Sequence, residues 1–164
     1  MSNPLKQDER AAARPKFAVD RMLGRLAKWL RVLGQDAIYG EHLTGYGLIR
    51  AAWAEDRLIL TRDRRLKQKQ PPPFIFIESD DFHAQLEQVI RACDLDFQAT
   101  LFTRCLRCNS PLDDIAKESV ETLVPAYVFA SQEKFSWCGR CRRVYWPATH
   151  HQQMVEELSR LKTR

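Results

Sequence analysis

Four cysteines stand in two pairs with the spacing of a metal site. Cys105 and Cys108 form one C-x-x-C pair, and Cys138 and Cys141 form a second. Each such turn lets two thiolates converge on one ion, and two turns complete the tetrahedral shell of a structural zinc. Because all four positions are cysteine, the shell has no open position for a substrate. The pattern predicts structural Zn²⁺; the alternatives, a redox pair or a disulfide, fit two matched pairs in a reducing compartment poorly.

Aspartates at the ends of apolar runs form the second group of residues with possible chemistry. Each of them closely follows a short β-type run: Asp20, Asp63, Asp80 and Asp81. In a parallel α/β sheet the carboxyl ends of the strands form the ligand crevice, so these carboxylates are expected at one edge. Converging carboxylates require a hard cation, and oxygen ligands suit Mg²⁺ or Mn²⁺. Such an ion can orient water for in-line attack on a phosphodiester.

The alternative for each aspartate is a helix N-cap. Asp20 and Asp81 both precede helical patterns, and aspartate is a preferred capping residue. Asp63 has no convincing helix to cap. The joint placement of the three at strand ends favours the metal site.

Short strands must position these side chains. The three apolar runs with the character of buried parallel strands are 16–19, 57–61 and 73–77, and a weaker one starts at Asp36. Helical patterns alternate with them, over 23–33, about 46–55 and 81–93. This alternation predicts an α/β layer fold with a mainly parallel sheet. A further strand is expected between the cysteine pairs, in the apolar segment 123–130.

The charge of the chain favours a polyanion partner. Lysine and arginine total 26 against 21 acidic residues, and the excess gathers in three stretches, 21–31, 57–69 and 134–143. Clustered base is typical of nucleic-acid binding, and a solvated basic face is the alternative. No apolar run approaches the roughly 20 residues that span a bilayer. The first residues lack the apolar core of a secretory signal, so we expect a flexible leader and a cytoplasmic protein.

Several blocks of the chain together resemble a known family. These blocks are "FAVDRMLGRLAKWLRVLGQDAIY", "LILTRD", "ESDDFHAQL" and "CGRCRRVYWPATH". In order and spacing they resemble the Mut-seven C-terminal ribonuclease family over about residues 16 to 155. The resemblance implies a PIN-like parallel sheet flanked by helices and followed by a small zinc ribbon. The expected parts are a leader at 1–15, a PIN-like domain at 16–100, a zinc ribbon at 101–150 and a C-terminal helix at 151–164.

The resemblance also implies roles for individual residues. Asp20 and Asp63 become the strongest ligands of catalytic Mg²⁺ or Mn²⁺, with Asp81 or Asp80 as another. Asp36 matches a recurring family aspartate, which either reaches the metal or stabilises its strand. The cations expected to bind RNA are Arg21, Arg25, Lys28, Arg62, Arg64, Arg140 and Arg142.

One departure from the family pattern keeps two functions open. Relatives often carry an acidic stretch before the helix that leads into "LILTRD", whereas this chain reads "LTGYGLIRAAW" at 43–53. The first hypothesis is a metal-dependent ribonuclease whose ribbon assists RNA binding. The second is a non-catalytic RNA-binding or adaptor module that retains a nuclease fold. The second hypothesis predicts RNA binding that survives loss of the strand-end aspartates, because lysine and arginine make the phosphate contacts.

Overall fold

The amino-terminal half is built on a parallel sheet. The structure, a computed structural model, describes residues 14–162. Residues 1–13 of the expected leader and 163–164 of the expected C-terminal helix lie outside this range. The strands are β1 (Phe17–Val19), β2 (Ala37–Ile38), β3 (Leu58–Thr61) and β4 (Phe74–Phe76). They lie in the order β2-β1-β3-β4 and all run parallel, which confirms the predicted sheet.

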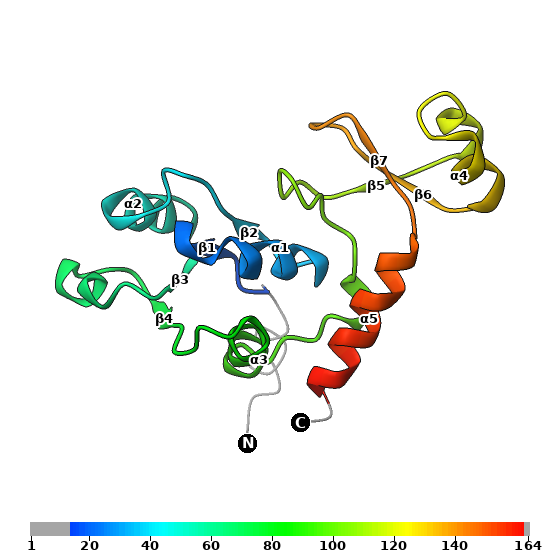
Figure 1. The fold of residues 1–164 in the computed structure, drawn as a ribbon. Helices are drawn as coiled ribbons and strands as arrows, with labels where there is room; N and C mark the ends of the chain where they lie inside the picture. The colour runs from blue at the N-terminus through cyan, green and yellow to red at the C-terminus, as the bar shows by residue number, and fades with distance from the viewer. Residues whose placement is uncertain (1–13, 163–164) are drawn as a thin grey trace, which may run out of the picture.

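Helices cover both faces of this sheet (Figure 1). On one face lie α1 (Gly24–Val32), which follows the short helix η2 (Arg21–Leu23), and α3 (Phe82–Ala92). On the other lie α2 (Gly45–Glu55) and the 3₁₀ helix η3 (Arg64–Lys69). The sheet is therefore the middle of three layers. The first turns of the helices lie near the carboxyl ends of its strands.

Leucine spacing explains the position of α1. The helix and its approach turn their apolar side to the sheet and bury four leucines at helical intervals, namely Leu23, Leu26, Leu30 and Leu33. Full burial of each stabilises the fold by about 1.5–3 kcal/mol. The chain then leaves the helix at Gly34 with φ +77°, where a Cβ would stand 2.0 Å from the carbonyl oxygen of Thr100. Only glycine fits this turn.

The cysteine-rich half is a small antiparallel sheet. It comprises β5 (Asp113–Ile115), β6 (Phe135–Cys138) and β7 (Arg143–Tyr145), in that order. It is preceded by a single-turn helix, η4 (Gln98–Thr100). Between β5 and β6 the chain forms two further short helices, η5 (Lys117–Val120) and α4 (Ala126–Ser131).

The expected strand at 123–130 is wrong, because α4 occupies this segment. Pro125 stands at the N-cap, where its fixed φ suits a helix start. Val120, Val124 and Val128 recur every fourth residue and are all buried in the core of the ribbon. Only Val128 of the three lies in α4; Val120 ends η5 and Val124 lies in the bend between the two helices, so tertiary packing prevails over the β propensity of valine.

A carboxy-terminal helix returns to the first half of the molecule. Helix α5 (Thr149–Lys162) runs back from the ribbon towards α3 (Figure 1), and Leu158 and Met154 pack in the core formed by α1 and α3. Among residues 14–162, no helix combines the length and apolar character that crossing a bilayer requires.

A buried polar network joins the ribbon to the sheet. Asn109, which follows the first cysteine pair, accepts a hydrogen bond from the backbone N–H of Ala37 at 3.0 Å. Its amide donates to the Asp36 carboxylate at 2.7 Å, and Arg57 donates to the same carboxylate oxygen at 2.6 Å. Asp36 precedes β2 and therefore lies at the amino ends of the strands, opposite Asp20.

A second connection comes from helix α1. Arg31 is 6% exposed, and its guanidinium donates to the carbonyl oxygens of Leu106 at 2.9 Å and Arg107 at 3.1 Å, both inside the first cysteine turn. It also donates to the carbonyl of Ala37 in β2 at 2.9 Å. One arginine therefore holds the turn and the edge strand together.

We predict that Asp36→Ala lowers the free energy of unfolding by about 1–3 kcal/mol, because it leaves the amide of Asn109 without this acceptor and removes one of the two carboxylates that Arg57 binds, the other being Glu55. Urea denaturation measures the change, with the exposed Asp113→Ala as the control. A loss for Asp36→Ala no larger than that for the control would contradict this role.

The pH dependence of this loss has a defined sign. Burial raises the pKa of Asp36, but hydrogen bonds from Arg57 and Asn109 outweigh it and hold the pKa below its ordinary value of 3.8. The contribution of Asp36 is therefore full above about pH 4 and disappears as the pH falls through the lowered pKa. The difference between the parent protein and Asp36→Ala should shrink over the same range.

Candidate functional site

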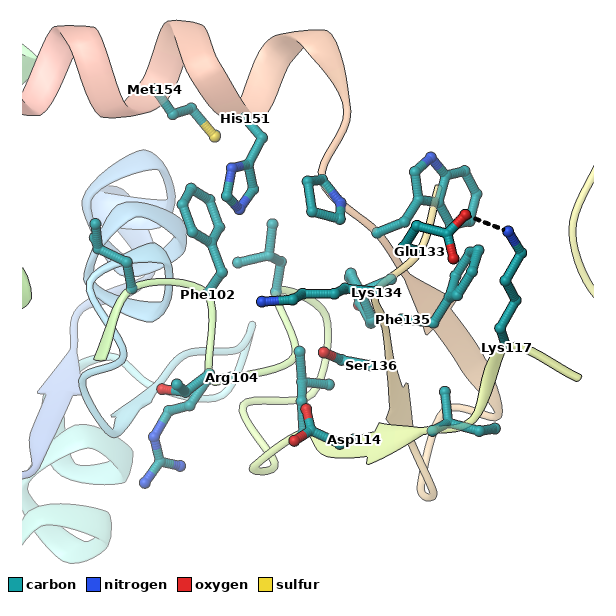
Figure 2. Close-up of a pocket in the computed structure, with 18 of the residues that line it drawn as sticks. Phe102, Arg104, Asp114, Lys117, Glu133, Lys134, Phe135, Ser136, His151 and Met154 are labelled. Carbon is teal, nitrogen blue, oxygen red and sulfur yellow. Dashed lines mark hydrogen bonds and ion pairs between the residues drawn. The ribbon is translucent and has the colours of Figure 1, made fainter. Parts of the chain in front are cut away.

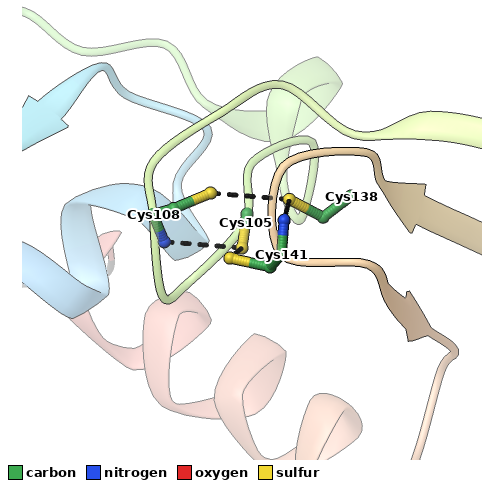
Figure 3. A group of neighbouring side chains, drawn as sticks. All are labelled: Cys105, Cys108, Cys138 and Cys141. Atoms are coloured by element: carbon green, nitrogen blue, oxygen red, sulfur yellow. Dashed lines mark hydrogen bonds between the residues drawn. The ribbon is translucent and has the colours of Figure 1, made fainter.

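The four cysteines of the ribbon converge on one point (Figure 3). Their sulfur atoms all lie within 4.8 Å of one another, with 3.8 Å between Cys105 and Cys141 and 3.4 Å between Cys108 and Cys138. Four sulfurs at about 2.3 Å from a tetrahedral zinc stand roughly 3.8 Å apart, so the arrangement fits that ion. The cysteine cluster can bind a metal and is consistent with the predicted structural zinc.

Backbone and side-chain hydrogen bonds hold this cluster in place. The backbone N–H of Cys108 donates to the sulfur of Cys105 at 3.5 Å, and that of Cys141 donates to the sulfur of Cys138 at 3.3 Å. The phenol oxygen of Tyr145, in β7, lies 3.1 Å from the Cys105 sulfur. These contacts suit thiolates, since each brings a donor group to sulfur.

The thiols differ in their readiness to ionise. Burial raises the pKa of Cys108, but hydrogen bonds with Ser110, Cys141 and Cys138 together outweigh burial and bring the pKa down to about 6. The hydrogen bond with Cys108, together with burial, raises the pKa of Cys141 to about 12. Negative charge on the first thiolates therefore opposes ionisation of the last, and a cation at the centre would remove that opposition.

Asp20 is the most enclosed of the predicted acids. It follows β1 at the carboxyl edge of the sheet, and its backbone N–H donates to the carbonyl of Leu60 at 2.9 Å. The residue is 2% exposed; one carboxylate oxygen accepts a hydrogen bond from the Thr61 hydroxyl at 2.6 Å. The other oxygen, Oδ1, is buried without a hydrogen-bond partner among the described residues. Its side chain makes no capping bond to the following helix.

Thr61 brings Asp63 beside Asp20. The threonine hydroxyl that donates to Asp20 also accepts from the backbone N–H of Asp63 at 3.0 Å. Asp63 does have a helix to cap, contrary to the expectation: its carboxylate accepts from the backbone N–H of Arg65 at 2.9 Å and begins η3. The Arg65 side chain also binds it at 3.0 Å, and this hydrogen bond is the main cause of the lowered pKa of Asp63.

Asp80 and Asp81 have other partners. Asp80 is highly exposed and forms an ion pair with Arg62. Asp81 caps α3 by accepting from the backbone N–H of Ala84 at 3.0 Å, as in the N-cap alternative. Neither joins Asp20 and Asp63 in a tight group. Within residues 14–162, the cysteines are the only group of three or more possible ligands whose atoms all come within 4.8 Å of one another.

The predicted RNA-binding cations lie in two places. Those near the carboxyl edge come from η2, α1 and the segment after β3, and they are Arg21, Arg25, Lys28, Arg62 and Arg64. Most are exposed, although Arg62 is half-buried and paired with Asp80. Arg140 and Arg142 are exposed in the second cysteine turn, on the ribbon.

A separate cavity of about 720 Å³ lies between the ribbon and α5 (Figure 2). Its wall is mainly apolar, and the Phe102 ring stacks on His151 with 3.3 Å between ring centroids. An ion pair of 2.7 Å between Lys117 and Glu133 stands in the same wall. None of the predicted aspartates lines this cavity, so it is distinct from the acidic edge.

Thr61 was not among the predicted site residues, although its hydroxyl contacts both Asp20 and the backbone of Asp63. The available signal was a lone hydroxyl at the end of an otherwise apolar strand, directly before "RD" in "LILTRD". Thr61 is fully buried, so its hydroxyl requires hydrogen-bond partners. The carboxylate of Asp20 and the backbone N–H of Asp63 supply them.

The fold and its ligand groups define a class: an α/β domain with carboxylates at the edge of a parallel sheet, joined to a four-cysteine ribbon. Residues 15–158 match the family model of the Mut7-C RNAse domain, and the chain therefore belongs to that family. None of the curated proteins and none of the solved structures compared with the chain matches it. Family membership indicates a ribonuclease-like function with RNA as the substrate.

We predict that Cys138→Ser releases the metal, because a serine hydroxyl does not ionise to replace the thiolate. Elemental analysis of the purified chain should find about one zinc per parent molecule and close to none in the variant. Cys93→Ser is the matched control, since Cys93 lies outside the cluster at the end of α3. Zinc retained in full by Cys138→Ser would contradict the four-thiolate site.

Proposed function

We propose that this chain is a metal-dependent ribonuclease with a PIN-like fold, in which Asp20 and Asp63 hold Mg²⁺ or Mn²⁺ at the carboxyl edge of the sheet. The observation that carries the proposal is the buried Oδ1 of Asp20, which has no hydrogen-bond partner among the described residues. An unpaired carboxylate oxygen out of water is costly. A hard cation would coordinate this oxygen. No described basic side chain lies within hydrogen-bond distance of it.

The surrounding residues fit such an ion. The Thr61 hydroxyl occupies one oxygen of Asp20 and leaves the other available. The backbone N–H of Asp63 is anchored to the same hydroxyl, which places this residue next to Asp20 in the fold. Its present partner Arg65 is exposed, and exposed ion pairs contribute little to stability, so Arg65 can be displaced at small cost.

In the proposed cleavage reaction, the ion and the side chains of the protein have separate roles. When bound, the ion would activate water and stabilise charge that develops on the phosphate. Asp20 and Asp63 fix its place, and Thr61 fixes Asp20. The exposed cations Arg21, Arg25 and Arg64 are suited to hold phosphates of the substrate near the acidic edge.

The ribbon is proposed to contribute binding and not chemistry. Its metal shell is closed by four sulfurs and has no position for substrate. Arg140 and Arg142 project from the second cysteine turn as exposed cations, which suit contacts with the RNA backbone.

One observation favours the alternative, a non-catalytic RNA-binding or adaptor module. Asp80 and Asp81 are committed to an ion pair and a helix cap, and no third carboxylate gathers with Asp20 and Asp63 in the described range. On this alternative the cations still bind RNA, since phosphate contacts do not depend on the acids.

We predict that Asp20→Asn and Asp63→Asn each reduce RNA cleavage by about 100-fold or more, because each removes a charged ligand of the catalytic ion. Both substitutions keep the local structure: asparagine still accepts from Thr61, and it caps η3 as well as aspartate does. The assay is cleavage of labelled single-stranded and structured RNAs with Mn²⁺, with Mg²⁺ and without either ion.

The exposed Asp113→Asn in the ribbon is the control and should cut RNA like the parent. Cleavage that needs the ion and is lost in both edge variants supports the ribonuclease. If the parent protein binds RNA but never cuts it, and both variants bind equally well, the adaptor alternative holds instead.

A further inference from the structure

Helix α2 carries an unusual exposed stripe. It consists of Tyr46, Arg50 and Trp53, which we call the α2 stripe. The three are four and three positions apart, so they fall on one side of the helix. Tyr46 is 67% exposed and Trp53 is 63% exposed. The buried side of the helix, which packs on the sheet, is formed by Leu48, Ile49 and Ala52.

Cations accompany the aromatic rings. Lys69, the last residue of η3, places its ammonium 4.7 Å from the centre of the Tyr46 ring. Arg50 lies between the two rings along the helix and forms no ion pair with any residue from 14 to 162. The stripe therefore alternates flat aromatic surfaces with free positive charge.

Acidic groups near the stripe are largely engaged. Glu55 forms an ion pair with Arg57 at 2.5 Å, and Glu41 lies 3.7 Å from Arg21. Asp56 is exposed, but it stands beyond the last turn of the helix. The first two turns, with Tyr46 and Arg50, face solvent as a positive and aromatic surface.

The stripe begins at the edge that carries the acids. Because α2 connects parallel strands, its first turn lies at the carboxyl edge of the sheet and its last turn at the amino edge. The loop before it is tied to the acidic edge by the hydrogen bond from the backbone N–H of Arg21 to the carbonyl of Leu43, at 2.9 Å. Lys69 ends the same short helix that Asp63 begins. The stripe thus leads away from the acid pair.

We propose that the α2 stripe is a stacking platform for single-stranded RNA, on which unpaired bases lie against Tyr46 and Trp53 while Arg50 and Lys69 contact the phosphates between them. Base stacking on exposed aromatic rings is tolerant of sequence, and it requires unpaired bases. Along the helix the two rings are about 10 Å apart, a span on the order of three nucleotides at about 3.4 Å each. The role in substrate guidance rests on the proposed ribonuclease function, whereas the binding itself does not.

The charges argue for RNA and against a protein on this face. An apolar protein partner would leave Arg50 and Lys69 without compensation in the interface, and buried unpaired charge is costly. A polyanion with flat bases satisfies both kinds of residue at once.

The test is a fluorescence-anisotropy titration of dye-labelled oligouridylate in the Asp20→Asn background, without added Mg²⁺ or Mn²⁺, so that the probe is not cut and binding is measured independently of tryptophan emission. Tyr46→Ala and Trp53→Ala should each weaken binding by roughly 5- to 100-fold. Tyr127→Ala is the matched control, since this tyrosine is 74% exposed but lies on α4 of the ribbon. It should bind like the parent.

A second variant separates stacking from folding. Trp53→Phe keeps an aromatic surface and should retain binding, while the quenching of tryptophan emission by oligouridylate should largely disappear. Duplex RNA of the same length should produce little quenching in the parent protein.

Unchanged binding by both alanine variants would overturn the proposal, whether or not the protein cuts RNA. So would equal quenching by duplex and single strand. Loss of self-association by the alanine variants with unchanged RNA binding would assign the stripe to a second copy of the chain and would likewise overturn it. Failure of the ribonuclease assay alone, with stripe-dependent binding intact, would refute catalysis but not the platform.

Discussion

The buried polar contacts between the first cysteine turn and strand β2 are the constraint on which the two halves of the molecule depend. β2 is a two-residue edge strand, too short to define its own position, and it pairs only with β1. Asn109 fills its open edge like an added strand residue, and Arg31 binds both the turn and β2. The turn carries two of the four clustered cysteines, so a metal bound by that cluster would also support one edge of the parallel sheet.

The aspartates at the two ends of this sheet differ in how their carboxylates are hydrogen-bonded. At the amino end, Asp36 is saturated by Arg57 and Asn109, so its charge is fully compensated and serves stability. At the carboxyl end, Asp20 is more deeply buried than Asp36 but keeps one oxygen without a hydrogen-bond partner among the described residues. Because proteins are only marginally stable, a buried carboxylate oxygen without a hydrogen-bond partner is expected where a ligand compensates the cost of its burial. The contrast between these two aspartates, and not the number of acids, distinguishes the proposed site from the structural network.

Features that depend on residues close together in the sequence could be predicted, and features that depend on contacts between distant residues could not. The strands of the parallel sheet, the helices that alternate with them and the cysteine cluster follow from local periodicity and spacing, and the structure has them where the sequence placed them. The three strands of the ribbon were not predicted. The segment 123–130 was misassigned because its valines favour strands locally, whereas a helix begins after Pro125 and buries Val128 in the core of the ribbon. Neither the Thr61 bridge nor the Asn109 contact was predictable, since each depends on residues that only the tertiary fold brings together. The α2 stripe was visible in "YGLIRAAW" only once its buried side was known.

Among the described residues no third carboxylate joins Asp20 and Asp63, which raises the question whether two aspartates suffice to hold a Mg²⁺ ion. Mg²⁺ is commonly held by one or two carboxylates, with water and substrate phosphates in the remaining positions. On the proposed function, Asp20 and Asp63 supply the protein's share and the RNA itself completes the coordination. Ion affinity would then be weak without substrate and strengthened by it. A site of this kind needs the RNA strand to be held independently of the ion, and an aromatic and cationic platform beginning at the same edge of the sheet would provide that hold.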